Sequence, residues 1–598
     1  MSDENTYGRE TIQVVEIEQP RCVNRFGTSP CTASGTPKCY NVFWTCLDKS
    51  NYDGTGSIKW RFTRPQDQIR WLYNETDANN IETNAYPMLR SVSTTSSRIN
   101  VAASRKGESP LGTRATVTIV MQDQVWDDHV GDFYLSDRSS PSARPGFWAL
   151  WTARNPLYPN IKIRVYEGYK GQDLSSMQVR LYDLENVDGP DASGRVTIKG
   201  RDPLDKARGK KAKFPKTSQI DLAADITAST TTIPVTCLES ELDATYGNTG
   251  DIKYVAIGTE IIEYQGYTGT EPDLTLSNVV RGRLDTTADS HSAGDAVQRV
   301  GRYESLEPYK IAEDLLEQHT EIPNSYVNTS GQWNDEGGTF LSTMKATATI
   351  PEPTSIEDML GELCRDGMFS IWWDERLQRI PLIAVRPPQE TPVVWTDALN
   401  ILQGSLSKTV KPDDRMTRVS VFFGQRDPFE PLDTADNYAN RRIRVDGEVE
   451  LAEASGGEIV ENTIFSRWLQ TFGNALLVSA SQLLRYRLPP QYITVSVDAK
   501  DRSISIGDVV DIEDRSQVDI EGNRVQTRWQ VISVTETAPG TTVECELQSY
   551  NYVGKFAIIM ANDAPDYASA TDEEKLSGCW IAENTGLMPD GSEPYLLQ

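Results

Sequence analysis

Four of the eight cysteines of this chain lie within one short stretch near its start. Residues 21–46 read RCVNRFGTSPCTASGTPKCYNVFWTC and contain Cys22, Cys31, Cys39 and Cys46. Thiolates bind soft metals and can also form disulfides, so this arrangement could support either chemistry. Even six extended residues reach about 20 Å, so the connecting loops are long enough to bring all four thiols to one centre.

The spacing of these cysteines does not by itself identify a metal. It lacks the CxxC turns that are typical of zinc ribbons and ferredoxins. Gly27, Pro30, Ser34, Gly35 and Pro37 indicate loops between the cysteines, and a bound metal would hold such loops together with little apolar burial. Iron-sulfur or zinc ligation, two disulfides and unrelated thiols all remain open.

The expected redox compartment favours metal ligation over disulfides. The first residues, MSDENTYGRETIQ, show no basic region followed by an apolar stretch, so no secretory signal is expected. Disulfides seldom stabilise proteins of a reducing cytoplasm. The other four cysteines are isolated, and we expect them to pack as small hydrophobic side chains: Cys237, Cys364, Cys545 and Cys579.

The sequence shows no motif that predicts catalysis, and a non-enzymatic protein is expected. The three histidines, His129, His291 and His319, are far apart, and GxSxG, HExxH and P-loop patterns are absent. Tryptophans could line a sugar-binding surface, but in a β-rich chain they more often anchor cores and interfaces. These two alternatives apply to Trp148, Trp151, Trp372 and Trp373.

The charge balance argues against a general affinity for nucleic acid. The 598 residues carry a formal net charge of -27, from 86 acidic and 59 basic side chains, and such a surface repels phosphate backbones. No apolar run of about 18 residues is present, so no membrane segment is expected. Residues 201–216 reverse the trend with seven basic and two acidic residues. They predict either a solvated turn or a contact with an acidic neighbouring subunit.

Length and periodicity predict a multidomain protein that is mainly β with α+β parts. A chain of this length exceeds a single core. Alternating and β-branched residues predict half-buried strands in residues 1–216, which form a β-barrel or sandwich. Strands are expected there at 11–18, 40–44, 57–62, 115–121, 161–171 and 177–187. Residues 217–303, with short strands and turns, predict a small all-β insertion.

Residues 304–400 predict an α+β unit. Ser355 is expected to cap a helix that ends at Gly367. The stretch FSIWWDERLQRIPLIAV that follows is typical of a β-hairpin.

Strand patterns return in residues 401–550, interrupted by one amphipathic helix. Apolar residues at steps of three and four predict this helix over 464–487. Residues 551–598 are rich in acidic residues, proline and glycine, and predict an extended acidic C-terminal arm that finds partners.

Several stretches follow one another along residues 10–550. They are the four-cysteine segment with YNVFWTCLDKSNY, then IKIRVYEGY, VTIKGRDPLDKARGKKAKFP, GTEIIEYQGYTG, VVRGRLDTTADSHSAGD, RWLQTFGNALLVSASQLLRYRLPP and SIGDVVDI. Their succession resembles the baseplate hub, or tail tip, proteins of long-tailed bacteriophages and gene transfer agents.

This resemblance implies a structural virion protein of the tail tip, assembled in the host cytoplasm and used in genome ejection. Such hubs are homotrimers that link a hexameric distal tail protein ring to a central fibre or spike protein, close to the tape measure protein. Each subunit contributes two tube-type β-barrels, for which 10–216 and 401–550 are the candidates. Three chains then adapt sixfold to threefold symmetry around a channel that passes DNA without binding it.

The resemblance also bears on the cysteines. Some relatives hold an iron-sulfur cluster through four cysteines, which implies a 4Fe-4S cluster on Cys22, Cys31, Cys39 and Cys46. Because the intervals match no fixed family pattern, zinc or no metal stays open.

Two other functions compete with the hub. A carbohydrate-binding adhesin of the tail tip predicts clustered exposed tryptophan and tyrosine in residues 217–303. A tail-associated hydrolase predicts a cleft that holds acids of perturbed pKa.

Overall fold

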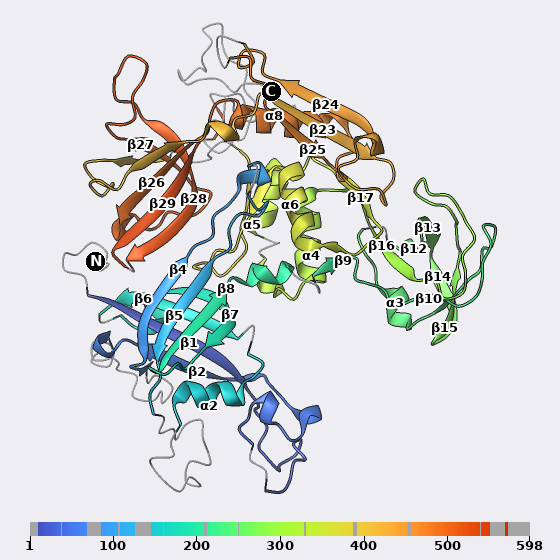
Figure 1. The fold of residues 1–598 in the computed structure, drawn as a ribbon, viewed down its shortest axis with the longest axis horizontal. Helices are drawn as coiled ribbons and strands as arrows, with labels where there is room; N and C mark the ends of the chain where they lie inside the picture. The colour runs from blue at the N-terminus through green and yellow to red at the C-terminus, as the bar shows by residue number, and fades with distance from the viewer. Residues whose placement is uncertain are drawn as a thin grey trace.

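The computed structural model describes residues 10–36, 39–67, 85–105, 108–125, 145–158, 161–170, 172–208, 212–248, 250–327, 331–386, 392–451, 456–538, 540–550 and 569–571. Several separate sheets surround a small group of central helices (Figure 1). The predicted class, a multidomain and mainly β protein with α+β parts, is confirmed.

An eight-stranded sheet forms the N-terminal part. Its strands are β1 (Thr11–Arg21), β2 (Gly56–Thr63), β3 (Ala85–Tyr86), β4 (Leu89–Thr95), β5 (Thr116–Gln122), β6 (Lys162–Tyr169), β7 (Gln178–Asp188) and β8 (Arg195–Arg201). They lie in the order β3, β2, β1, β6, β7, β8, β5, β4. The two edge strands are therefore consecutive in the chain, separated only by residues 87 and 88. One short segment serves both edges, so the sheet curls around its core.

The core of this first sheet lies on its concave side. Burial alternates along β5, as its period-two pattern predicts. The inward side chains of the sheet, among them Phe62, Ile119 and Ile163, share this core with Trp148 of helix α2 (Phe147–Arg154).

A six-stranded second sheet repeats this edge arrangement. Its strands are β21 (Val393–Thr396), β22 (Ser407–Val410), β26 (Gln491–Asp498), β27 (Val509–Glu513), β28 (Thr527–Ala538) and β29 (Thr542–Ser549). They lie in the order β21, β27, β28, β29, β26, β22, so consecutive strands again form the two edges. In both sheets the first edge strand is parallel to its neighbour and the second is antiparallel. Among the described residues, the strand pairings do not close either sheet into a barrel, so tube-type barrels remain a prediction.

A hairpin arm links the first sheet to the rest of the molecule. The strands β4 and β5 lead from the first sheet towards the central helices, where the short helix η5 (Val101–Ala103) lies (Figure 1). The N–H of Ala102 donates to the Ser370 hydroxyl at 2.8 Å, and the hydroxyls of Ser104 and Tyr486 lie 2.9 Å apart. The arm therefore contacts the central unit and the C-terminal half together.

The central unit is built from helices α4 (Pro308–His319), α5 (Gln332–Phe340) and α6 (Ile356–Gly367). The Ser355 side chain accepts a hydrogen bond from the N–H of Asp358, so the predicted cap of α6 is confirmed. The predicted hairpin forms from β19 (Phe369–Ile371) and β20 (Leu382–Ala384). This unit also draws on the chain before residue 216, because β9 (Lys213–Phe214) pairs with β18 (Thr354–Ser355).

A three-stranded sheet of β24 (Tyr438–Val445), β23 (Arg418–Gln425) and β25 (Glu461–Phe465) packs against helix α8 (Phe472–Tyr486). The helix is shorter than the predicted 464–487, because residues up to Phe465 pair with β23 as a strand. Thr471 then caps the helix by accepting from the N–H of Asn474. Phe472 and Leu477, two apolar residues of this helix, are 54% and 41% exposed, since Ala475, Val478 and Leu483 face the sheet instead.

The insertion, on the right of Figure 1, contains two small sheets. One consists of β10 (Asp221–Leu222), β11 (Ile233–Thr236), β15 (Asp273–Ser277) and β14 (Gly266–Thr270). The other consists of β13 (Glu260–Tyr264), β12 (Lys253–Ile257), β16 (Val297–Leu306) and β17 (Ala346–Ile350). A short helix, α3 (Glu239–Asp243), accompanies them. Because β16 continues past residue 303 to pair with β17, the insertion joins the central unit through a shared sheet.

Two predictions remain to be compared with the structure: the strand at 40–44 and the arm 551–598. The strand expected at 40–44 does not form; the short helix η2 (Phe43–Thr45) stands there, and the left-handed φ of 58° at Asn41 interrupts any extended run. The predicted arm 551–598 lies outside the described residues except for 569–571. None of the helices in the described part of the chain is long and apolar enough to cross a bilayer.

Candidate functional site

The cysteine segment lies between β1 and β2 and leaves the first sheet as a set of loops with two short helical turns. Asn41 ties its first part together. The N–H of Cys22 donates to the Asn41 carbonyl at 2.8 Å, and the Cys39 thiol lies 3.5 Å from Asn41 Oδ1. One residue thus holds two cysteine positions that are far apart in sequence.

Asp48 ties the other two cysteine positions. Its carboxylate accepts from the N–H and the hydroxyl of Thr32, the neighbour of Cys31, at 2.7 Å and 2.9 Å. The Cys46 thiol lies 3.2 Å from the Asp48 carbonyl oxygen. Donation from Thr32 and Asn51 holds the pKa of Asp48 well below its usual range. The carboxylate is therefore a permanent charge that organises the loops.

The structure brings the four thiols within electrostatic reach of one another. Burial raises the pKa of Cys46 against a hydrogen bond to Asp48, and the charges of Cys39, Cys22 and Cys31 raise it further. None of these four cysteines forms a disulfide in the described part of the chain. No group of three or more acidic, histidine or cysteine side chains among the described residues is placed to hold a metal ion. The thiols are gathered, but they do not form a finished ligand set.

Cysteine thiolates are typical ligands of soft metal cations, so the residue types of this donor set are compatible with such a cation. Four neighbouring thiolates repel one another, and a cation would offset that repulsion. Their distances from one another would still have to adjust, because the described side chains are not in ligand geometry.

The segment is anchored on one side and exposed on the other. Val42 is buried, and the Arg154 guanidinium of α2 lies 4.0 Å from the centre of the Tyr40 ring. Four large apolar side chains are about half exposed, with values from 48% to 57%: Val23, Phe43, Trp44 and Leu47. Lys49 Nζ lies over the rings of both Phe43 and Trp44, so these two aromatic side chains lie side by side. We call these four side chains the cysteine-loop patch.

Three of the isolated cysteines are packed as predicted. Cys237, Cys364 and Cys545 are buried, and burial raises the pKa of each thiol, to about 11 for Cys237 and about 12 for Cys545. They are inert core residues rather than ligands. Cys579 lies outside the described residues.

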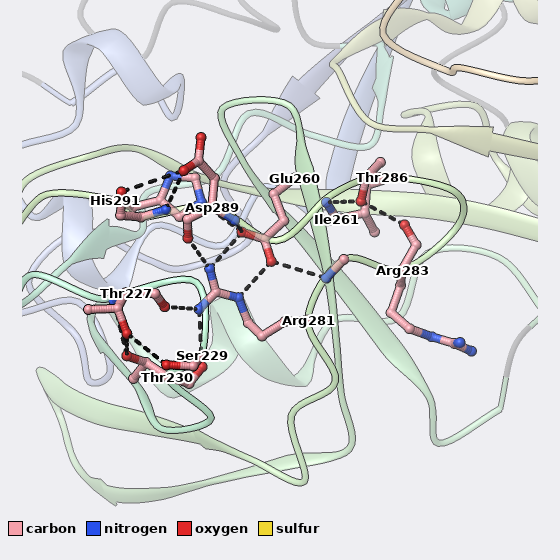
Figure 2. Close-up of polar contacts among 12 residues, drawn as sticks. Thr227, Ser229, Thr230, Glu260, Ile261, Arg281, Arg283, Thr286, Asp289 and His291 are labelled. Carbon is pink, nitrogen blue, oxygen red and sulfur yellow. Dashed lines mark hydrogen bonds and ion pairs between the residues drawn. The ribbon is translucent and has the colours of Figure 1, made fainter.

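A buried ion network organises the insertion. Arg281 donates to both carboxylate oxygens of Glu260 at 2.6 Å, and His291 Nε2 lies 2.8 Å from Glu260 (Figure 2). Arg281 also donates to the carbonyls of Thr227 and Thr230, which share one turn, and of Asp289, so it fastens two loops to one strand. Every partner is a group of the chain itself, which makes this a structural network.

The described residues of the insertion do not show the cluster of exposed tryptophan and tyrosine that an adhesin predicts. Residues 217–303 contain no tryptophan. Tyr254 and Tyr264 are buried, and Tyr246 is stacked against His319 at 5.4 Å between ring centres. Trp148, Trp151, Trp372 and Trp373 are likewise buried, so they are core anchors, as the second interpretation of the sequence predicted.

The histidines do not form a catalytic group in the described part of the chain. His291 contacts Glu260, and His319 packs edge-on against Phe214 at 4.8 Å between ring centres. His129 lies outside the described residues.

Described residues of the basic segment 201–216 line a cavity of about 680 Å³. Three of its basic side chains, Arg201, Lys206 and Arg208, are paired with acids of the same chain. Lys206 lies 2.8 Å from Asp183, and Arg208 lies 2.9 Å from Glu357. These pairs account for part of the local charge reversal without an acidic neighbour.

Comparisons with known proteins give no family assignment. No protein-family model matches the chain, and no curated protein matches it. A tail protein from Neisseria meningitidis MC58 is 9% identical, with 73% of this chain and 88% of that chain covered and a TM-score of 0.31. The 43 kDa tail protein of prophage MuSo2 from Shewanella oneidensis is 9% identical, with 74% and 92% covered and a TM-score of 0.34. A chain of the virion of a native gene transfer agent is 9% identical, with 63% and 79% covered and a TM-score of 0.27. These values are too low for the likeness to carry an argument.

Proposed function

We propose that this chain is the structural hub of a phage-type tail tip and acts in a homotrimeric ring. The observation that carries the proposal is the repeated edge arrangement of the first and second sheets. Two similar sheets in one chain supply six in a trimer, which matches a sixfold ring above and a threefold fibre or spike below. The distal tail protein, the central fibre or spike and the tape measure protein are the proposed partners.

The hairpin arm and the cysteine-loop patch support this role. A ring subunit needs its two sheets in a stable relation, and the arm joins the first sheet to the central unit by hydrogen bonds. It also needs surfaces that become buried on assembly. The cysteine-loop patch offers half-exposed aromatic and aliphatic side chains of the kind that anchor interfaces.

The charge of the chain suits a channel for DNA. With a formal net charge of -27, the surface offers duplex DNA little non-specific attraction. DNA would pass such a channel during genome ejection without being held.

We further propose that Cys22, Cys31, Cys39 and Cys46 hold a 4Fe-4S cluster, with zinc as the alternative. The ties through Asn41 and Asp48, which hold the loops close, support this proposal. The bound group would supply structural bracing, because its binding free energy adds to the stability of loops that bury few apolar side chains.

The mass and symmetry of the purified protein test the hub. We expect particles of three times the 66.7 kDa chain mass in native mass spectrometry, and threefold averages in electron microscopy. The trimer should bind a purified distal tail protein ring with one trimer per six copies. A stable monomer at micromolar concentration that does not bind this ring would overturn the proposal. Glycan binding or cell-wall hydrolysis by that monomer would favour the adhesin or the hydrolase instead.

A further inference from the structure

One buried arginine joins three parts of the chain. Arg180, on β7 of the first sheet, has a side chain that is only 2% exposed. Its guanidinium lies 3.2 Å from Glu167 on β6, 3.3 Å from Glu375 in the turn after β19, and 3.2 Å from Glu536 on β28 of the second sheet. The three carboxyl groups are 2% to 7% exposed. A single guanidinium thus faces three buried carboxyl groups.

This cluster is rich in acid. Buried charges that lack a partner are costly, so full ionisation of all three carboxyls is disfavoured. Neither oxygen of Glu536 accepts a hydrogen bond of good geometry from the N–H and O–H groups that the structure describes. A carboxyl proton on Glu167 would supply the missing hydrogen-bond donor and would also reduce the negative charge of the cluster.

The other groups that face the cluster offset this acidic excess only in part, because Arg376 and Arg502 act on Glu536 while Asp374 adds a further acid beside Glu375. Gln13 on β1 is neutral and donates to Glu167 at 3.1 Å. Arg376 donates to the carbonyls of Arg502 and Ile504. The charged or titratable groups that act on the three carboxyls from neighbouring positions include Tyr182, Asp202, Asp374, Arg376 and Arg502.

We propose that Glu167 and Glu536 share one proton and form a proton-dependent latch between the first and the second sheet. Glu167 carries the proton and donates it in a hydrogen bond to Glu536. If the sheets separate, both side chains meet water, where a glutamic acid loses its proton near pH 4.3. Opening of the latch therefore releases one proton.

The direction of the pH effect follows from this proton. Burial raises the pKa of Glu167 to about 7 against the effect of Arg180, and the charge of Glu536 contributes. Burial acts in the same direction on Glu536, but Arg180 and the hydrogen bond from Glu167 outweigh it and lower that pKa. The stabilisation that protonated Glu167 gives to the closed latch is complete below about pH 4.5 and is lost as the pH rises through about 7. The opening equilibrium constant should then rise about tenfold per pH unit between about pH 5 and 7, and level off above.

Hydrogen exchange of the full-length protein tests the latch. The amide of Leu181 donates to the Glu375 carbonyl, and that of Ile99 donates to the Ile532 carbonyl, so both report on contacts between the parts. After correction for intrinsic exchange rates, we expect their opening constants to increase about 100-fold from pH 5 to pH 7. In Glu167→Gln the amide cannot titrate, and the opening constant should stay low and independent of pH.

Two further variants separate the latch from general destabilisation. Glu536→Gln removes the neighbouring charge and should move the midpoint of the pH dependence to lower pH. Glu16→Gln is a matched control, because Glu16 is buried and pairs with Arg61 inside the first sheet; it should keep the wild-type slope. Amides of β12, in the insertion, should be unaffected in all variants. A wild-type protein without pH dependence, or an equal slope in Glu167→Gln, overturns the latch.

Discussion

The backbone N–H of Ile99 donates a 3.0 Å hydrogen bond to the carbonyl oxygen of Ile532. Ile99 belongs to the arm that leaves the first sheet, and Ile532 lies on β28 of the second sheet. The Ser533 hydroxyl donates to the Ser97 carbonyl beside it at 3.1 Å, and Arg98 forms an ion pair with Glu546 at 2.8 Å. Main-chain hydrogen bonding thus joins the arm of the first sheet to the second sheet. It fixes the relative position of the two sheets more firmly than side-chain contacts alone would.

The docking of this arm on α6 predicts the effect of a single added methyl group. In Gly361→Ala the new Cβ would lie 2.5 Å from Pro110 Cβ, too close for both groups to keep their positions. We expect a loss of about 1–3 kcal/mol in the free energy of unfolding. Denaturant titration measures this loss, and limited proteolysis at residues 108–113 should accelerate. Gly338→Ala in α5 is the control, because its Cβ meets nothing within 4 Å; it should be neutral or stabilising by up to about 1 kcal/mol.

The proposed cluster predicts metal in the purified protein. Cys39→Ser should remove most of the iron or zinc and lower the midpoint of thermal unfolding, because one ligand is lost from a set of four. Elemental analysis gives the metal content, and absorption near 400 nm distinguishes an iron-sulfur cluster from zinc. Cys237→Ala changes a buried thiol outside the set and should keep the metal. A metal-free wild-type protein prepared without oxygen would contradict the proposal.

The Arg281 network predicts a large effect of one substitution in the insertion. Arg281→Met leaves Glu260 buried without its main partner, which costs about 3–5 kcal/mol. Hydrogen exchange in β12 and β13 should rise accordingly. Arg283→Met removes the pair with Glu263, but Arg283 is 43% exposed, so the expected cost is below about 1 kcal/mol. Equal effects of the two variants would show that the network adds nothing beyond an ordinary surface pair.

The same network predicts acid sensitivity. Burial tends to raise the pKa of Glu260, but hydrogen bonds from Arg281 and His291 outweigh it, so the pKa lies below its usual value. A lowered folded pKa stabilises the insertion above about pH 4.5, and this contribution is lost as the pH falls through the folded value. Glu260→Gln should therefore destabilise the insertion at pH 7 and much less at pH 3. Thermal unfolding of both proteins at the two pH values measures this, and an unchanged difference would count against it.

Where neighbouring residues set the local structure, sequence patterns predicted it well. The cap at Ser355, the hairpin of β19 and β20 and the alternation of β5 all depend on side chains a few positions apart. The helix at 464–487 was overestimated because apolar steps of three and four continue into a segment that pairs with β23 instead. That competition between helix and strand is decided by a partner some 40 residues away, which the local pattern does not contain.

The sequence alone established the β-rich class, the acidic surface and the concentration of four thiols in one segment. Only the tertiary structure decided that Asn41 and Asp48 would tie those thiols' loops together, and that the two sheets would share an edge arrangement. The tertiary structure alone also placed Glu167, Glu375 and Glu536 around Arg180. The physical reason is that composition and periodicity act over a few residues, whereas a buried charge cluster depends on strands brought together from distant parts of the chain.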